Sequence, residues 1–207
     1  MPRQLPCLFA VLLLLVRCAA AAEPRVLFED TLDGELADGW SWLRENPDAW
    51  RFGGGGLEIH VEPGKADTVK NALVRPLSDA LPSDYAIELT VTFTSPPTNQ
   101  FEQGGITWYH DDKPAFKFVH EHIDGEDWII PGRKPAPNKT VQLRLEVRGD
   151  EWTARYRENA EDAYLTADSG NLPRRGNDQI SIQCYEGPAD AEHWIRFEDF
   201  RIIELNQ

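Results

Sequence analysis

YAIELTVTF, residues 85–93, alternates large apolar side chains with small or polar ones along its whole length. A repeat of two residues places successive side chains on opposite faces, which is typical of a β-strand with one buried and one solvated face. Ser95-Pro96-Pro97 follows directly, and two prolines cannot continue a hydrogen-bonded strand. The segment therefore predicts a strand with Ile87, Leu89 and Val91 in the core and Glu88 outside it.

The same alternation returns along the rest of the chain between groups of turn-forming residues, and no segment has convincing helical periodicity. The phase of the last run breaks near Glu198-Asp199, which predicts a β-bulge. Counting shorter segments, we expect about ten strands, spaced as in a sandwich or barrel. The clearest further runs are 57–61, 106–110, 116–120, 141–147, 152–156, 180–184 and 195–202.

Each predicted strand has only one apolar side. Strands buried on both faces would read as continuous apolar runs. We therefore predict an all-β protein, a two-sheet antiparallel β-sandwich whose apolar faces pack together. Residues 23–207 form one predicted domain, because about 185 residues can bury a full core.

The N-terminus predicts export. A charged start, Met1-Pro2-Arg3, precedes the apolar residues 8–16 and a small-residue site at 19–22, the features of a secretory signal peptide. The apolar core is much shorter than the roughly 20 residues of a spanning helix. We expect residues 1–22 to be removed, leaving a secreted, periplasmic or cell-surface protein with no membrane span in the mature chain.

The charge of the chain limits its partners. The formal net charge is −14, and loss of Arg3 and Arg17 with the signal would make it two units more negative. Nucleic acids and anionic lipids need a basic surface, so we expect neither as a partner. Cys184 would be the one remaining cysteine, in a position of the alternation that predicts burial, so no intrachain disulfide is expected. We expect a monomer.

An ordered series of short motifs adds a resemblance. The chain is similar to the concanavalin A-like domain at the C-terminus of family 43 β-xylosidases and to stand-alone proteins of that type. The resemblance implies a jelly roll with one convex and one concave sheet. Its wider class includes lectins, carbohydrate-binding modules, glucanases and alginate lyases, so the fold alone does not separate binding from catalysis. The motifs are GWSWLRENP (39–47), WRF (50–52), GLEI (56–59), NALVR (71–75), GGITWYHDD (104–112) and FKFV (116–119).

Our leading interpretation is a glycan-binding module. Sugar rings stack on flat aromatic side chains, while carboxylates, amides and guanidinium groups bind the hydroxyls. Trp42 and Trp128 lie in predicted loops and are candidates for stacking. Polar-strand candidates would line a groove if they share the concave sheet: Arg75, Glu88, Tyr109, Lys117, Arg144, Gln183 and Tyr185.

The first alternative is a glycan-active enzyme, either a hydrolase or a lyase. A glycoside hydrolase would need two carboxylates about 5–5.5 Å apart; the Glu-x-Asp-x-x-Glu pattern is missing, but Glu88, Glu121 or Glu146 could meet across strands. A polysaccharide lyase would use a base such as His120 or Tyr109. A domain that binds no sugar is the other alternative.

Oxygen-rich termini suggest a structural Ca²⁺ as a possible cofactor. Glu29 and Asp30 lie near the start of the domain and Asp199 near its end, and backbone carbonyls would have to complete the shell. His120 and His122 share one strand face, but a zinc site would need further ligands from elsewhere.

Overall fold

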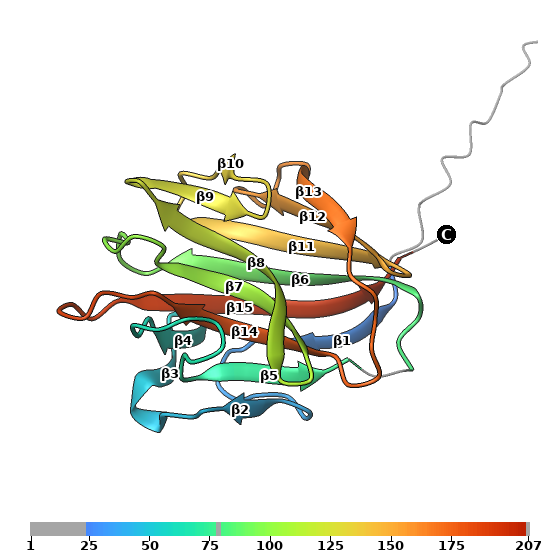
Figure 1. Cartoon of the computed structure of the whole chain (residues 1–207), viewed down its shortest axis with the longest axis horizontal. Coiled ribbons are helices and arrows are strands. Elements are labelled where there is room, and N and C mark those ends of the chain that lie inside the picture. Colours follow the sequence, from blue (N-terminus) through green and yellow to red (C-terminus); the bar gives the residue numbers. More distant parts are fainter. Residues whose placement is uncertain (1–23, 78–79, 206–207) are drawn as a thin grey trace, which may run out of the picture.

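A computed structural model describes residues 24–77 and 80–205. Two antiparallel sheets face each other, and one continuous hydrophobic cluster fills the space between them (Figure 1). The predicted two-sheet antiparallel β-sandwich, a jelly roll, is confirmed. The predicted signal peptide and its cysteines, Cys7 and Cys18, lie outside the described residues.

Sheet A has the strand order β13-β12-β11-β6-β15-β4-β3, and β1 pairs with the C-terminal half of β15. Its strands are β1 (Val26–Asp30), β3 (Trp50–Gly53), β4 (Gly56–His60), β6 (Asp84–Phe93), β11 (Thr140–Arg148), β12 (Glu151–Arg157), β13 (Leu165–Asn171) and β15 (Trp194–Glu204).

Sheet B has the order β10-β9-β8-β7-β14-β5-β2, and a single 3-10 turn, Pro47–Ala49, precedes β3. Figure 1 shows β8 bending as it runs along this sheet. The strands are β2 (Ser41–Leu43), β5 (Ala72–Pro76), β7 (Gln103–His110), β8 (Lys113–Ile123), β9 (Glu126–Ile130), β10 (Lys134–Pro135) and β14 (Gln179–Tyr185).

The alternation of the sequence sets the strand faces. In sheet A, Leu89 of β6 lies opposite Leu143 of β11, and both side chains are fully buried. In sheet B, Ile182 of β14 lies opposite Ile106 of β7, again with both buried. Such apolar cross-strand pairs are the basic stabilising contacts of a sheet, and here both rows face the same core. Cys184 belongs to that core, as predicted.

The two sheets approach closely where β7 crosses β15. A Cβ atom on Gly104 would lie 2.8 Å from the Cδ1 atom of Ile195, so a larger residue here would push the sheets apart. The bulge predicted near Glu198-Asp199 is confirmed: the pairing of β15 with β6 shifts between Glu198 and Arg201, and Asp199 has φ 54°.

Candidate functional site

The outward side of sheet B, called face B below, carries a row of side chains across four neighbouring strands. Gln103 of β7 pairs with Tyr185 of β14 on one side and with Glu121 of β8 on the other, and Glu121 pairs with Trp128 of β9. Directly paired residues point to the same side of a sheet, so the register places these four side chains in line.

A second row lies further along the same strands. Thr107 of β7 pairs with Ser181 of β14 and with Lys117 of β8. Gln183 and Tyr109 alternate in phase with Ser181 and Thr107, on the same side. Five of the nine residues predicted to bind a ligand therefore share face B: Tyr109, Lys117, Trp128, Gln183 and Tyr185.

Three polar groups of face B bind one another in a closed triangle. The Lys117 ammonium donates to Gln103 Oε1 and to Glu121 Oε2, each at 2.8 Å, and Gln103 Nε2 donates to Glu121 Oε1 at 3.2 Å. Glu121 is almost completely buried, whereas the Lys117 side chain remains 36% exposed. Lys117 is thus the accessible member of a charge-balanced network.

Next to the triangle lies a network of hydroxyl and amide groups around Tyr109, with the Arg44 guanidinium beside it. The Tyr109 hydroxyl lies 2.5 Å from the Ala66 carbonyl oxygen and 2.9 Å from Gln183 Oε1, and the Ser181 hydroxyl donates to the same Oε1 atom at 3.0 Å. The carbonyl of Ala66 comes from the loop between β4 and β5, so that loop packs against this end of face B.

Some buried polar atoms of this network have no partner among the described residues. They are Gln183 Nε2, Thr107 Oγ1 and Arg44 Nη2. Arg44 Nε donates to the Val69 carbonyl at 2.6 Å, which holds the guanidinium group beside Tyr109. Each unpartnered buried polar atom costs about 1–3 kcal/mol of stability.

The two tyrosines of face B are held in the neutral form. Burial raises the pKa of Tyr185, and the nearby Glu121 carboxylate raises it further. Burial also raises the pKa of Tyr109, partly opposed by Arg44. A neutral phenol can both donate and accept a hydrogen bond, but it is a poor proton acceptor in catalysis.

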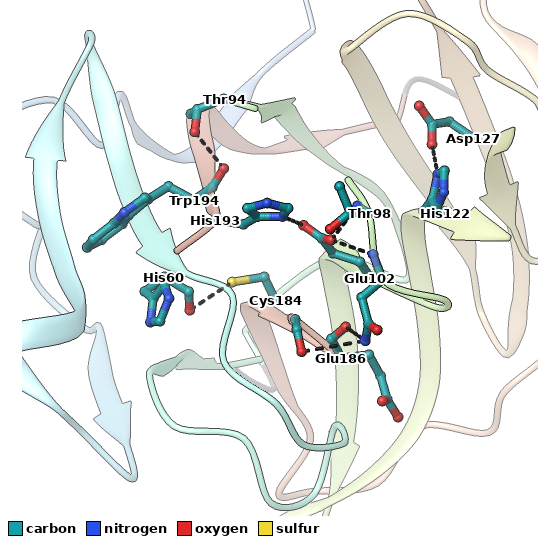
Figure 2. Close-up of polar contacts among 12 residues, drawn as sticks. His60, Thr94, Thr98, Glu102, His122, Asp127, Cys184, Glu186, His193 and Trp194 are labelled. Carbon is teal, nitrogen blue, oxygen red and sulfur yellow. Dashed lines mark hydrogen bonds and ion pairs between the residues drawn. The ribbon is translucent and has the colours of Figure 1, made fainter. Parts of the chain in front are cut away.

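The alternation of polar residues did not reveal Glu102, which fixes one end of sheet B (Figure 2). Its Oε1 atom lies 2.8 Å from His193 Nδ1, and its Oε2 atom accepts the backbone N–H groups of Thr98 and Asn99 at 3.0 and 3.3 Å. Asn99 Nδ2 donates to the Glu186 carbonyl at 2.7 Å. A single carboxylate thus joins the loop before β7 to the loop after β14.

The outward side of sheet A, called face A below, holds other predicted residues. Glu88 lies between two arginines: Arg144 contacts one of its oxygens, and Arg201 Nη2 lies 2.6 Å from the other. Arg144 also donates to Glu146 at 2.9 Å. The candidate acids Glu88 and Glu146 therefore face away from Glu121, which lies on face B.

The other candidates lie on neither face. His120 points into the core, where its ring lies 4.7 Å from that of Phe93 and burial lowers its pKa to about 4. His120 and Tyr109 are therefore on opposite sides of sheet B.

Two of the ligand candidates contact aromatic rings near the edge of the sandwich. The Trp42 ring packs on Trp50 at 4.9 Å, and the Arg75 guanidinium lies 3.4 Å from the ring centre of Phe28. The groove expected to hold all nine ligand candidates is thus divided.

The oxygen-rich termini do meet, in a hollow of face A lined by Glu29, Asp30 and Asp199 among others. Asp30, however, already accepts N–H groups from Leu32, Ala37 and Trp40 at 2.8–2.9 Å, which fixes the loop after β1. Within residues 24–77 and 80–205, no group of three or more His, Cys, Asp or Glu side chains is arranged to hold a metal ion.

Solved structures share this fold. The GH43 protein BlXynB of Bacillus licheniformis matches with a TM-score of 0.69 and 17% identity over 86% of this chain and 39% of its own. The xylan β-1,4-xylosidase of Bacillus halodurans matches with a TM-score of 0.61 and 14% identity over 89% of this chain and 40% of its own. This chain therefore corresponds to well under half of either protein, and the resemblance to the C-terminal domain of GH43 xylosidases is confirmed as a fold.

A third structure, from work on endo-acting O-glycanases of the human gut microbiota, matches with a TM-score of 0.61 and 11% identity. It covers 87% of this chain and 100% of its own. No protein-family model matches the sequence, and no curated protein is significantly similar to it. The named neighbours are glycan-active proteins, but at these identities the likeness is one of fold. Within the described part of the chain, no helix is long and apolar enough to cross a membrane.

Proposed function

We propose that this protein is an exported glycan-binding module and that face B is its binding surface. The observation that carries the proposal is that Lys117 and Trp128, two partly exposed side chains of face B, flank the buried Glu121 carboxylate, which Lys117 hydrogen-bonds and Trp128 faces across the strands. An ammonium–carboxylate pair beside an aromatic ring combines groups that recognise sugar hydroxyls with one that recognises a sugar ring face.

Trp128 is suited to contact the sugar ring. It is half-buried, its Nε1 donates to the Ile123 carbonyl at 3.3 Å, and the Arg133 guanidinium lies 5.0 Å from its ring centre. These contacts fix the indole in the same row as Glu121. A sugar stacked there would bring its hydroxyls to Lys117, which has one N–H left after its two hydrogen bonds.

Export is part of the proposal and depends on the signal features of residues 1–22. The excess of acidic residues favours neutral glycans over polyuronates, which carry the same sign of charge. Glycan-active proteins among the structural neighbours support the class of ligand.

Catalysis on face B is a second candidate. The structure from work on endo-acting O-glycanases shares the fold over 100% of its own length, and an alginate lyase from Klebsiella pneumoniae shares it over 86%. Binding ranks first because Glu121 is ion-paired to Lys117, which suits a fixed charge better than a proton donor. The raised pKa values of Tyr109 and Tyr185 also oppose a tyrosine base.

The test combines a glycan array with assays for reducing ends and unsaturated uronates on plant, algal and microbial polysaccharides. We expect binding without turnover, and about a tenfold loss of affinity in Trp128→Ala. Trp194→Ala is the matched control, since Trp194 is another half-buried indole under an arginine, with Arg51 at 4.0 Å, but lies away from face B. Turnover abolished by Glu121→Gln would establish the enzyme instead, and absence of both activities would leave a domain that binds no sugar.

A further inference from the structure

Face A contains a hollow of about 310 Å³ that the proposed function does not use. It lies between β1, β6, β11 and β15, and Tyr164, from the loop after β12, forms part of its wall. Its volume is at the lower end of the range for small-molecule sites, which suits a ligand of one or two rings.

Ion pairs hold the floor of the hollow in place. Both oxygens of Glu88 are bound, one by Arg144 and the other by Arg201. On the wall, Arg157 Nε donates to Gln142 Oε1 at 2.6 Å, and the guanidinium lies 4.5 Å from the ring centre of Tyr164. A ligand would therefore meet side chains whose positions are already fixed.

Other groups lining the hollow have unused hydrogen-bonding capacity. Within the described residues, the exposed carboxylates of Glu29 and Asp199 and the hydroxyl of Tyr164 make no side-chain hydrogen bond or ion pair. The Gln142 amide uses its oxygen for Arg157 and keeps its N–H donors. The hollow thus offers two strong acceptors, one amide donor and one phenol that can do either.

We propose that this hollow is a second binding site, separate from face B, and that its ligand is a neutral sugar unit. An anion would be repelled by Glu29 and Asp199, and a cation beside Gln142 and Tyr164 would meet the Arg157 guanidinium, which has no ion-pair partner among the described residues. Hydroxyl groups carry no charge and both donate and accept, so a neutral polyol can satisfy carboxylates, amide and phenol together. The choice of sugar as the polyol rests on the proposed function.

Sites on the outward sides of two packed sheets point in opposite directions. A domain with both sites would hold two glycan segments at once and could link neighbouring chains of a polysaccharide. The overall affinity for a polysaccharide rises without any new contact where neighbouring chains reach both sites at once.

The test is backbone amide NMR of the mature protein titrated with neutral oligosaccharides: xylohexaose, cellohexaose and mannohexaose. We expect one of them to shift two separate groups of signals, one around Lys117 and Trp128 and one around Gln142 and Tyr164. Tyr164→Ala should weaken binding at the second group at least tenfold and leave the first unchanged. Thr153→Ala, on face A but outside the hollow, is the control for both groups.

Each proposal has its own contradicting result. If none of the three neutral sugars shifts the signals around Gln142 and Tyr164, the second site is wrong, whatever happens on face B. If those signals shift while the signals of face B do not, the second site stands and the proposed function of face B fails. Sodium glucuronate and glucosamine test whether the hollow prefers a neutral sugar. That preference is wrong if either compound binds the hollow as tightly as glucose, their neutral counterpart.

Discussion

Faces A and B are built from the same alternating strands, but their polar rows differ in kind. Face A joins full charges, with Glu88 between Arg144 and Arg201. Face B joins mainly amides and hydroxyls, with the pair Lys117–Glu121 as its one ion pair among the paired rows described above. Among the described residues, ion pairs satisfy Glu88 on face A but leave Glu29 and Asp199 without side-chain partners, and on face B Gln183 Nε2 and Thr107 Oγ1 are unpartnered. Two sheets with the same backbone can therefore carry different polar chemistry on their outward sides: ion pairs on face A, and mainly amides and hydroxyls on face B.

The comparison depends first on each strand having two distinct sides. Leu143→Ala removes a fully buried side chain between the outward residues Gln142 and Arg144, so we expect the free energy of unfolding to fall by about 2–5 kcal/mol. Chemical denaturation measures the loss. A midpoint that hardly moved would mean that the sides of β11 are inverted, and with them the assignment of face A.

The next largest effect comes from His120, which lies between the sheets. Burial lowers the pKa of His120 to about 4, below its usual 6.5, so between those values the unfolded chain binds the proton and the folded chain does not. The wild type should therefore lose up to about 3 kcal/mol of stability as the pH falls from 6.5 to 4. The loss should be smaller in His120→Phe. Equal pH dependence of the two proteins would place His120 outside the core.

A third prediction separates the two faces by their charges. Glu88→Gln leaves Arg144 and Arg201 without their shared carboxylate, and we expect a loss of about 1–3 kcal/mol in unfolding free energy. Glu121→Gln removes one ion pair whose lysine is partly solvated, so its cost should be smaller, about 1 kcal/mol. Denaturation at low and high salt measures both. A larger loss for Glu121→Gln would reverse the contrast between the faces.

The smallest expected effect is on binding. Thr153 lies on face A outside the hollow, so Thr153→Ala should leave glycan affinity unchanged, while Lys117→Met should reduce it. Titration calorimetry on both variants makes the comparison. A reduced affinity in Thr153→Ala, or an unchanged affinity in Lys117→Met, would contradict the assignment of the glycan to face B.

Much of the fold could be predicted because the side on which a residue lies depends on local alternation. Ile87 and Glu88 could be assigned to opposite sides from the sequence alone, and the bulge at Glu198-Asp199 followed from a break in phase. Which strands become neighbours depends on contacts far apart in the chain, such as β6 with β15. The sequence therefore could not tell that Glu88 and Tyr109 belong to different sheets.

For the candidate site too, local alternation predicts the side of the strand on which a residue lies. Tyr109, Gln183 and Tyr185 lie on polar sides of predicted strands and do meet on face B. Glu102 was missed because it precedes its strand as an isolated acid, and its partners Thr98 and His193 come from loops whose approach no local pattern encodes. Trp42 looked like a loop residue but packs on Trp50, because aromatic rings can reach the core from short strands at an edge.

The pairing of β1 with β15 has a mechanical consequence. Val26 lies opposite Ile203, and the Glu204 N–H donates to the Arg25 carbonyl at 2.8 Å, so the outer ends of both strands sit side by side. A force pulling these two ends apart would act across the ladder and open its hydrogen bonds one at a time, as in a zipper. Tension applied through both ends of the domain should therefore peel β1 away at low load, before the sheets around faces A and B are disturbed.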